Sequence, residues 1–457
     1  MNLQQSQHTY FLGIGGIGMS ALAHWRLGQG RAVSGYDRTR SVVTESLEKA
    51  GARIFYSEDL AHLEGIDFVV YTPAIPQSHI EFQHVLSAGI PMVKRAAALG
   101  ELSKAYKTLA VAGTHGKTST SAMLAHVLRH AGVDATAFLG GLVRSLGGNF
   151  VSGKSDWMVA EADEYDRSFL QLQPDWTVIT ALDPDHLDIY GSAENMLETY
   201  RQLGRQSGNL LVHVSAENAG WKGDFITYGI GEGDYQAVNI RTEGLKTVFD
   251  WKGPEGEMKN VSLMLPGRHN VLNATAALAL AAKAGADMSR FADALASFTG
   301  IYRRFEILAH SSTLSYVDDY AHHPAEIEAA IQTARELFPQ RKLLVVFQPH
   351  LYSRTRDFAE GFGESLAKAD AVRLMAIYPA RELPIEGVSS ELILSLMPNE
   401  NKAMVSREAL IDALEQEIEE PTVVLSLGAG DIDKETSRLR DFIQKRISNH
   451  TANTQTA

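Results

Sequence analysis

One segment constrains the fold of this chain more than any other: Leu109-Ala-Val-Ala-Gly-Thr-His-Gly-Lys-Thr-Ser-Thr120. An apolar run leads through a glycine-bracketed turn into a helix-like stretch, Ser119 to His130. A strand that turns through glycines into the N-terminus of a helix presents backbone N–H groups and a partial positive charge, which together bind phosphate. In such a loop Lys117 can reach the outer phosphates of a nucleotide, and the Thr118 hydroxyl can bind Mg²⁺. The segment therefore predicts a nucleoside triphosphate site.

The match to the usual phosphate loop is incomplete, because Gly116-Lys-Thr is preceded by Gly113-Thr-His and not by a glycine further upstream. The alternative interpretation is a turn that has this composition by chance. The strand before the turn and the helix after it are the context that the motif requires, so they favour the phosphate loop. The residues expected to contact the nucleotide in this loop are Gly113, Thr114, His115, Gly116, Lys117, Thr118 and Ser119.

The length of the chain limits the number of domains, and its net charge limits the kinds of partner that it can bind. At about 100 to 200 residues per domain, 457 residues predict two to four domains, of which we expect three. Forty-two basic residues against 55 acidic ones give a net charge of −13, which opposes binding to nucleic acid or to an anionic membrane. Any anionic ligand must therefore be held by local groups.

Other functions are excluded by what the chain lacks. It has no cysteine, so disulfides, thiolate catalysis and cysteine-ligated metals cannot operate. Its start lacks the basic and apolar blocks of a signal peptide, and no run of about 18 apolar residues occurs. We expect a cytoplasmic protein, as a monomer or a weak homodimer.

The pattern of strands and helices predicts an α/β fold with three domains. The first hundred residues alternate short β-rich runs with helical stretches, which is typical of parallel βαβ units. A second α/β unit starts with the phosphate loop, and a third opens near Ser315. The expected boundaries are 1–104 for a Rossmann-like domain, 105–299 for a central phosphate-loop domain with a mostly parallel sheet, and 300–457 for a second Rossmann-like domain.

The first domain carries another glycine loop, Gly13-Ile-Gly-Gly-Ile-Gly18, between its first strand and helix. Because it precedes the phosphate loop in the chain, it is the first glycine loop and the phosphate loop is the second. Asp37 ends the next strand, about 20 residues further on, as in a dinucleotide-binding fingerprint. Taken alone, the loop predicts a pyrophosphate at the helix N-terminus.

Two acidic segments follow strands of the central domain. Glu161 ends an apolar strand, where a carboxylate beside a phosphate loop is suited to bind Mg²⁺. The residues after it, Asp163, Glu164 and Asp166, could equally form a solvated acidic turn. His186 lies after the next strand and is either a second metal ligand or a structural hydrogen-bonding residue.

Further polar segments suggest the rest of a pocket. Asn270 and Asn273 start an alanine-rich helix, either as helix caps or as amides that face one ligand. Three more segments, Arg303-Arg-Phe-Glu306, Asp318-Asp-Tyr-Ala-His-His-Pro324 and Gln348-Pro-His-Leu-Tyr-Ser-Arg-Thr-Arg356, place polar and aromatic residues directly after apolar strands or turns. At the ends of parallel strands such residues commonly line a pocket.

With these segments in this order, from Tyr10 to Asp431, the chain resembles the Mur ligases. The resemblance is carried by the two glycine loops and by Glu161-Ala-Asp-Glu, Asp185-His-Leu-Asp, Gly267-Arg-His-Asn-Val-Leu-Asn, Arg303-Arg-Phe-Glu, Asp318-Asp-Tyr-Ala-His-His-Pro and Gln348-Pro-His. It implies a UDP-sugar domain first, an ATPase domain second and an amino-acid-binding domain third.

The resemblance also implies roles for individual residues, with ATP and Mg²⁺ as the cofactors. Lys117, Glu161, His186 and Arg304 are the implied catalytic residues, and Thr118, Glu161 and His186 the metal ligands. Adenine and the rest of the ATP would contact Asn270, Asn273, Arg304 and Asp319. The UDP-sugar would contact Gly15, Gly16, Ile17, Gly18, Asp37, Thr72 and His115. The amino acid would contact Tyr320, His322, His350 and Arg354.

The chain departs from the family pattern at two places. Related ligases often have an arginine where this chain has Leu351, so that charge is missing here. Some members use a carbamylated lysine near the metals, but no lysine occurs between Lys154 and Lys222. The member that adds L-alanine is not expected to need that lysine.

Within the family, the chain is most similar to the member that joins L-alanine to the lactyl carboxylate of UDP-N-acetylmuramate. The implied reaction passes through an acyl phosphate and yields ADP and phosphate. The nearest alternative is a murein peptide ligase, which adds a recycled tripeptide to the same UDP-sugar. The first glycine loop fits the alanine-adding member better.

Two alternatives come from other classes of protein. A nicotinamide-dependent oxidoreductase would explain the first glycine loop with Asp37 but would leave the phosphate loop without a role. A nucleotide switch that binds a protein partner would explain the phosphate loop but not the polar segments of the third domain.

Overall fold

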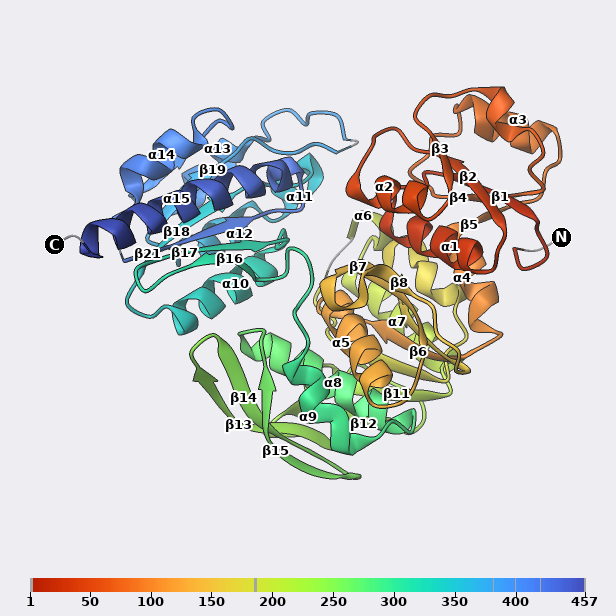
Figure 1. Ribbon diagram of the computed structural model, residues 1–457, viewed down its shortest axis with the longest axis horizontal. Coiled ribbons are helices and arrows are strands. Elements are labelled where there is room, and N and C mark those ends of the chain that lie inside the picture. The colour runs from red at the N-terminus through yellow and green to blue at the C-terminus, as the bar shows by residue number, and fades with distance from the viewer. Residues whose placement is uncertain (1–2, 185–186, 381, 399, 420, 456–457) are drawn as a thin grey trace. The chain divides into compact units, whose positions relative to one another are not determined.

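The computed structural model describes residues 3–184, 187–380, 382–398, 400–419 and 421–455. The chain divides into two compact units. The first unit comprises Met1–Arg241, Val248–Met264 and Asn270–Thr299, and the second comprises Thr242–Thr247, Leu265–His269 and Gly300–Ala457. Three β-sheets carry the fold, two in the first unit and one in the second (Figure 1).

The first sheet is entirely parallel, in the order β3-β2-β1-β4-β5. Its strands and the helices around it are β1 (His8–Leu12), α1 (Ile17–Gly28), β2 (Ala32–Tyr36), α2 (Val42–Lys49), β3 (Arg53–Phe55), η1 (Leu60–Leu63), β4 (Phe68–Tyr71), α3 (Ile80–Ser87), β5 (Met92–Lys94) and α4 (Arg95–Ser103). Adjacent residues of β1 point to opposite faces, so Phe11 packs with α1 and α4 while Tyr10 packs with α3. Both faces are therefore buried, which is typical of parallel sheets.

The second sheet has ten strands, in the order β15-β14-β13-β12-β11-β10-β6-β9-β7-β8. Its first half contains β6 (Lys107–Ala112), α5 (Lys117–His130), β7 (Thr136–Val143), η2 (Arg144–Leu146), β8 (Gly148–Val151), β9 (Trp157–Glu161), η3 (Tyr165–Gln171), β10 (Trp176–Ile179), α6 (Leu187–Tyr190), α7 (Ala193–Gln206) and β11 (Asn209–His213). Its second half contains η4 (Val214–Ala216), β12 (Ile226–Ile230), β13 (Tyr235–Glu243), β14 (Lys246–Gly253), β15 (Gly256–Leu263), α8 (Arg268–Lys283), η5 (Met288–Arg290) and α9 (Phe291–Ala296). From β7 through β13 neighbouring strands run parallel, while β8 pairs antiparallel with β7.

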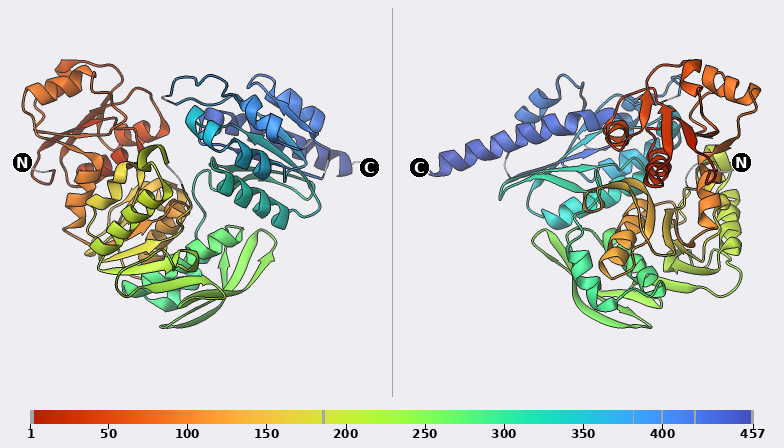
Figure 2. Two further views of the ribbon diagram at one scale, coloured as in Figure 1. Left: turned by 180° about the vertical axis from the view of Figure 1, so that it is seen from behind. Right: turned by 45° about the vertical axis from the view of Figure 1, so that its right-hand side comes forward.

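The third sheet has the order β16-β17-β21-β18-β19-β20 and is parallel except for β16. Its elements are β16 (Glu306–His310), β17 (Leu314–Asp319), α10 (Pro324–Leu337), β18 (Lys342–Phe347), α11 (Tyr352–Asp357), α12 (Ala359–Leu366), β19 (Ala371–Leu374), α13 (Ser390–Leu396), β20 (Lys402–Met404), α14 (Leu410–Glu417), β21 (Thr422–Leu427), η6 (Asp431–Glu435) and α15 (Thr436–Gln455). Along β18, Leu343, Val345 and Phe347 pack with α10, α12 and α13. Leu344 and Val346 pack with α14 and α15 on the other face. Helices therefore cover both faces of this sheet (Figure 2).

Strand order determines where ligands can bind in each sheet. In an open α/β sheet the crevice lies at the carboxyl ends of the strands, where the strand order reverses. In the first sheet this point lies between β1 and β4, and in the second it lies at β6, between β9 and β10. The two glycine loops follow β1 and β6, so both loops lie at such a point.

The α/β fold with parallel sheets is confirmed, and most predicted elements lie where the sequence placed them. The helix after the phosphate loop begins at Lys117, two residues before its predicted start at Ser119. The short strands β3, β5 and β20 and the antiparallel edge strand β16 were not predicted. The boundaries after residues 104 and 299 remain predictions.

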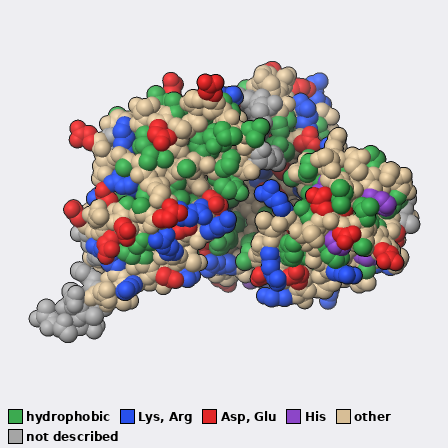
Figure 3. Space-filling model, turned by 90° about the horizontal axis from the view of Figure 1, so that it is seen from above, with side chains coloured by type: hydrophobic (Ala, Val, Ile, Leu, Met, Phe, Trp, Pro, Cys, Tyr) green, Lys and Arg blue, Asp and Glu red, His purple; other side chains and the backbone are tan. Residues whose placement is uncertain are grey.

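The surface of the protein carries charged side chains of both signs. On the face drawn in Figure 3, acidic and basic side chains are interspersed. Among the described residues, no helix is both long and apolar enough to cross a membrane.

Candidate functional site

The second glycine loop connects β6 to α5 and depends on two glycines. Gly113 has φ 129° and Gly116 has φ 79°, which are values that favour glycine. A Cβ on Gly113 would lie 2.1 Å from Thr180 Oγ1, and one on Gly116 would lie 2.5 Å from Asn273 Oδ1. The loop therefore approaches its neighbours too closely for any side chain at these two positions.

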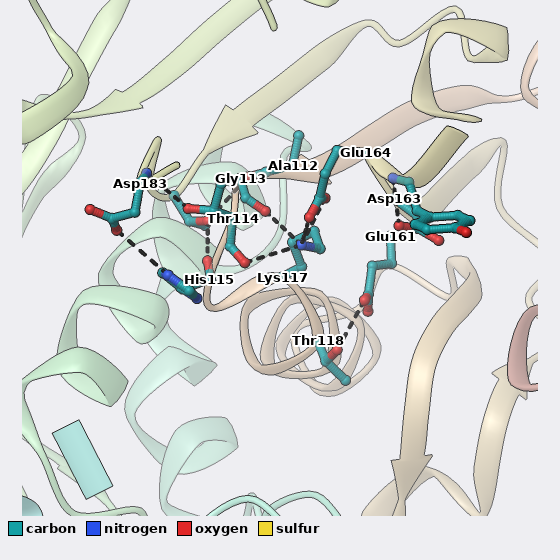
Figure 4. Close-up of polar contacts among 12 residues, drawn as sticks. Ala112, Gly113, Thr114, His115, Lys117, Thr118, Glu161, Asp163, Glu164 and Asp183 are labelled. Atoms are coloured by element: carbon teal, nitrogen blue, oxygen red, sulfur yellow. Dashed lines mark hydrogen bonds and ion pairs between the residues drawn. The ribbon is translucent and has the colours of Figure 1, made fainter. Parts of the chain in front are cut away.

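Lys117, the first residue of α5, turns back over this loop (Figure 4). Its Nζ donates hydrogen bonds to the carbonyl oxygens of Gly113 at 2.7 Å and Thr114 at 3.3 Å, and to Glu164 Oε1 at 2.9 Å. Burial opposes the charge of Lys117, but the carboxylate of Glu164 outweighs that cost and holds the pKa of the ammonium above its usual value. The ammonium is therefore charged and fixed at the mouth of the loop.

Glu164 is buried, so the solvated acidic turn predicted as an alternative for it is wrong. Its side chain is 3% exposed and lies 2.8 Å from Lys117 Nζ. Tyr190 donates a hydrogen bond to the Glu164 carbonyl at 2.5 Å, which fixes the turn that carries the carboxylate. Sequence alone could not separate Glu164 from Asp166, whose side chain is 46% exposed, because both lie in the same acidic run.

Thr118 and Glu161 meet beside the lysine. Thr118 Oγ1 donates a hydrogen bond to Glu161 Oε1 at 2.9 Å, and the backbone N–H of Gly140 donates to Glu161 Oε2 at 2.8 Å. Ser121 also donates to Glu161 Oε2, at 3.3 Å. A hydroxyl and a carboxylate are oxygen ligands of the kind that Mg²⁺ prefers, so this pair fits the predicted metal site.

The second predicted metal ligand, His186, lies outside the described residues. Among the residues that the structure does describe, no group of three or more His, Asp or Glu side chains is arranged to hold a metal. A metal at Thr118 and Glu161 would therefore need ligands from substrate phosphate or water, as Mg²⁺ usually does.

The loop is also fastened to the segment after β10, by residues that the sequence did not single out. Thr180 Oγ1 donates to the carbonyl of Ala112 at 3.1 Å and also to that of His115. Thr114 Oγ1 accepts from the backbone N–H of Asp183 at 3.1 Å, and His115 Nε2 lies 3.7 Å from Asp183 Oδ2. Their position after β10, a neighbour of β6, is the signal that could have indicated them.

Asn270 and Asn273 lie within α8, which starts at Arg268, so they are not helix caps. Both side chains are buried, and Asn273 Oδ1 accepts a hydrogen bond from Thr120 of α5 at 3.2 Å. The helix therefore brings Asn273 into contact with the second glycine loop.

The first glycine loop is held by Asp37. The backbone N–H of Gly15 donates to Asp37 Oδ2 at 2.8 Å, and the N–H of Thr39 donates to Oδ1 at 3.2 Å. Thr72 follows β4, and its methyl lies 2.5 Å from where a Cβ on Gly13 would be. The first glycine loop, Asp37 and Thr72 therefore lie close together, at the carboxyl ends of β1, β2 and β4.

Arg304 and Asp319 lie in the second unit, at the carboxyl end of β17. Asp319 accepts hydrogen bonds from the backbone N–H groups of Phe305 at 2.6 Å and Ala321 at 2.7 Å. Burial raises the pKa of Asp319 to about 6, against the opposing effect of Arg304. The Arg304 guanidinium lies 5.3 Å from the centre of the Tyr320 ring.

Of the four residues predicted to contact the amino acid, Tyr320 and His322 lie in the loop after β17, His350 follows β18, and Arg354 is a buried residue of α11. The ring of His322 lies 5.3 Å from that of Tyr320 and 6.2 Å from that of His350. Burial lowers the pKa of His322 to about 4, and the charge of Arg354 acts in the same direction. His322 is therefore neutral at pH 7.

Tyr378 belongs to this group and was not predicted. Its ring stacks on His350 at 5.8 Å, its N–H donates to the Pro349 carbonyl at 2.8 Å, and its carbonyl accepts from the N–H of Leu351 at 2.9 Å. Leu351 adopts φ 71°, which a branched side chain rarely does, so this turn is strained beside the cluster. The tyrosine follows a short strand with no motif of its own, so the sequence offered no signal for it.

The chain thus carries two glycine loops, the Thr118–Glu161 pair and histidine-rich turns after β17 and β18, and comparison with known families identifies the class of protein to which it belongs. Residues 8–107 match the Mur ligase family catalytic domain, residues 111–281 the Mur ligase middle domain, and residues 303–430 the Mur ligase glutamate ligase domain. The chain belongs to the Mur ligase family.

Comparison with individual proteins shows which members of the family this chain is similar to. The chain is 42% identical over 462 residues to the UDP-N-acetylmuramate–L-alanine ligase of Cytophaga hutchinsonii, which covers 98% of this chain and 99% of the relative. It superimposes with a TM-score of 0.80 on the crystal structure of the UDP-N-acetylmuramate–alanine ligase of Thermotoga maritima, at 32% identity over 97% of this chain and 99% of that one. A murein peptide ligase from Psychrobacter arcticus shares the fold, with a TM-score of 0.70 at 23% identity over 96% and 98% of the two chains.

Proposed function

We propose that this protein is the ligase that joins L-alanine to UDP-N-acetylmuramate at the expense of ATP. The observation that carries the proposal is the convergence of Lys117, Thr118 and Glu161 on one loop at the switch point of the second sheet. The near full-length similarity to alanine-adding ligases supports the choice of acceptor. The proposed domain roles are UDP-sugar binding for 1–104, ATP binding for 105–299 and amino-acid binding for 300–457.

The reaction begins with activation of the sugar, because a free carboxylate is a poor acylating agent. The lactyl carboxylate attacks the γ-phosphorus of ATP, its oxygen forms the new bond, and ADP leaves with the electrons of the broken bond. Lys117 neutralises charge on the transferring phosphoryl group, a step that depends mainly on positioning and electrostatics. Mg²⁺ at Thr118 and Glu161 would supply further neutralisation of phosphate charge.

The second step forms the amide bond. The amine of L-alanine, once deprotonated, attacks the acyl carbonyl, and inorganic phosphate leaves. Tyr320, His322, His350 and Arg354 form the proposed alanine pocket. With its pKa lowered by burial, His322 adds no positive charge that would repel the incoming amino group.

The remaining contacts are proposed from the resemblance to the Mur ligases. Asn270, Asn273, Arg304 and Asp319 contact ATP. Gly15 to Gly18, Asp37, Thr72 and His115 contact the UDP-sugar. His186 is the proposed second metal ligand.

A product assay tests this function against the murein peptide ligase alternative. The enzyme is incubated with ATP, Mg²⁺ and UDP-N-acetylmuramate, and either L-alanine or the recycled tripeptide, and the products are identified by mass. We expect the alanyl product with L-alanine and no product with the tripeptide. A tripeptide product in the absence of an alanyl product would establish the alternative.

A further inference from the structure

A guanidinium lies directly against the first turn of α1, at the glycine loop of the first sheet. Arg95 is the first residue of α4 and follows β5. A Cβ on Gly18 would lie 2.7 Å from Arg95 Nη1 and 2.8 Å from its Cδ. The third glycine of a G-x-G-x-x-G loop usually allows close packing of helix and strand. Here it makes room for an arginine, which adds a full positive charge to the N-terminal end of the helix.

Arg95 retains most of its hydrogen-bonding capacity. Its side chain is 21% exposed. Within the described part of the chain it makes one hydrogen bond, from Nη2 to Asp163 Oδ2, at the long distance of 3.5 Å. A guanidinium has five N–H donors, and Asp163 is 43% exposed, so the pair contributes little stability. An anionic ligand could replace Asp163 at small cost.

The first turn of α1 is fixed in place by a second contact. Asn149 of β8 is buried, and its Nδ2 donates to the Ile17 carbonyl at 2.6 Å and to Ser20 Oγ at 2.9 Å. The central sheet thus holds the helix start against which Arg95 lies. A cation on a fixed scaffold loses little conformational entropy when it binds a ligand, which favours affinity.

The loop also needs a cation, because Asp37 lies on it. That carboxylate accepts the N–H of Gly15 and lies 2.8 Å from where a Cβ of Gly15 would be. A diphosphate at the loop would be repelled by Asp37 unless a positive charge compensates. Arg95 contacts the same loop through Gly18 and can supply that charge.

We propose that Arg95 binds the diphosphate of the UDP-sugar, exchanging Asp163 for phosphate oxygens. The proposal rests on the proposed function and adds a residue to its UDP-sugar site. The planar guanidinium can donate two parallel hydrogen bonds to a phosphate, which a lysine cannot.

The test measures ligand affinity in full-length variants by calorimetry, with UDP-N-acetylmuramate, UDP and uridine as probes. Loss of charge-assisted hydrogen bonds predicts that Arg95→Ala weakens binding of UDP-N-acetylmuramate and of UDP by about 10- to 100-fold. Uridine affinity should not change, because uridine has no diphosphate for Arg95 to bind. Lys94→Ala is the matched control, because this neighbouring cation is 50% exposed and pairs with Asp166 at 3.1 Å; it should keep the parental affinities.

The other possible results distinguish failure of the Arg95 proposal from failure of the proposed function. Parental UDP affinity in Arg95→Ala, or equal weakening in Arg95→Ala and Lys94→Ala, would overturn the proposal. If Arg95→Ala does not fold, Arg95→Lys decides: weaker UDP binding supports the bidentate contact, and unchanged binding overturns it. A parental enzyme that binds no UDP-N-acetylmuramate would instead refute the proposed function, independently of Arg95.

Discussion

At the residue scale, Lys117 stabilises the second glycine loop through its hydrogen bonds. Its ammonium has three protons, and its partners are the Gly113 and Thr114 carbonyls and the Glu164 carboxylate. A phosphate oxygen can bind this ammonium only by replacing one of these three hydrogen-bond acceptors. Glu164 therefore holds the charge of Lys117 in place before a nucleotide binds.

Replacement of Lys117 tests its role in phosphoryl transfer. Lys117→Ala should lower turnover by about 10²-fold or more, because charge stabilisation of the transferring group is lost. UDP-sugar binding should stay nearly intact. The variant should also lose stability, since Glu164 is left buried without its cation.

The double variant Lys117→Ala/Glu164→Gln separates the two effects. It should recover stability in thermal unfolding without recovering turnover in a phosphate-release assay. Retention of more than about a hundredth of parental turnover by the single variant would remove Lys117 from this role.

The second residue-scale prediction concerns His322, whose pKa burial lowers to about 4. A histidine that folds in its neutral form contributes stability above its unfolded pKa of about 6.5, and this contribution is lost as pH falls toward 4. An NMR titration of the His322 ring in the free protein should therefore show a midpoint near 4. A midpoint near 6.5 would show that the ring is solvated and that the alanine pocket is open.

At the element scale, the sequence predicted the strands and helices that bear the glycine loops. The apolar runs before the two glycine loops predicted β1 and β6, because the strands of a parallel sheet are buried on both faces and are therefore apolar. The sequence also placed Thr118 in the phosphate loop and Glu161 at the end of a strand beside that loop. It could not predict that Glu164 turns inward or that Tyr378 stacks on His350, since tertiary packing decides both contacts.

Gly140 of β7 tests how the elements position the proposed metal ligands Thr118 and Glu161. A Cβ there would lie 2.2 Å from Glu161 Oε1, so Gly140→Ala should displace the carboxylate from Thr118. Disturbance of a group that orients a ligand predicts an increase of about 10- to 100-fold in the Mg²⁺ concentration needed for half-maximal activity.

Gly28→Ala, at the end of α1, is the matched control for Gly140→Ala, because an added Cβ meets nothing within 4 Å there. It should leave the Mg²⁺ dependence unchanged. The same dependence in Gly140→Ala and the parent enzyme would show that Glu161 does not hold the metal.

At the scale of the whole molecule, a chain with a net charge of −13 must hold anionic substrates through local groups. In the proposed function, the first unit holds such substrates at two places, the loops after β1 and β6, and each loop lies at the switch point of its sheet. The second unit carries the histidine-rich turns after β17 and β18. We therefore propose that the two phosphate-bearing substrates bind mainly to the first unit and the amino acid mainly to the second.

In the proposed reaction, the sugar carboxylate itself attacks the γ-phosphorus of ATP. The most direct test labels the lactyl carboxylate of UDP-N-acetylmuramate with the heavy oxygen isotope and follows that isotope during turnover with ATP, Mg²⁺ and L-alanine. Because amide formation expels the phosphate together with one former carboxylate oxygen, mass spectrometry should find one labelled oxygen in each inorganic phosphate released. Phosphate without label, alongside normal formation of the alanyl product, would contradict the account.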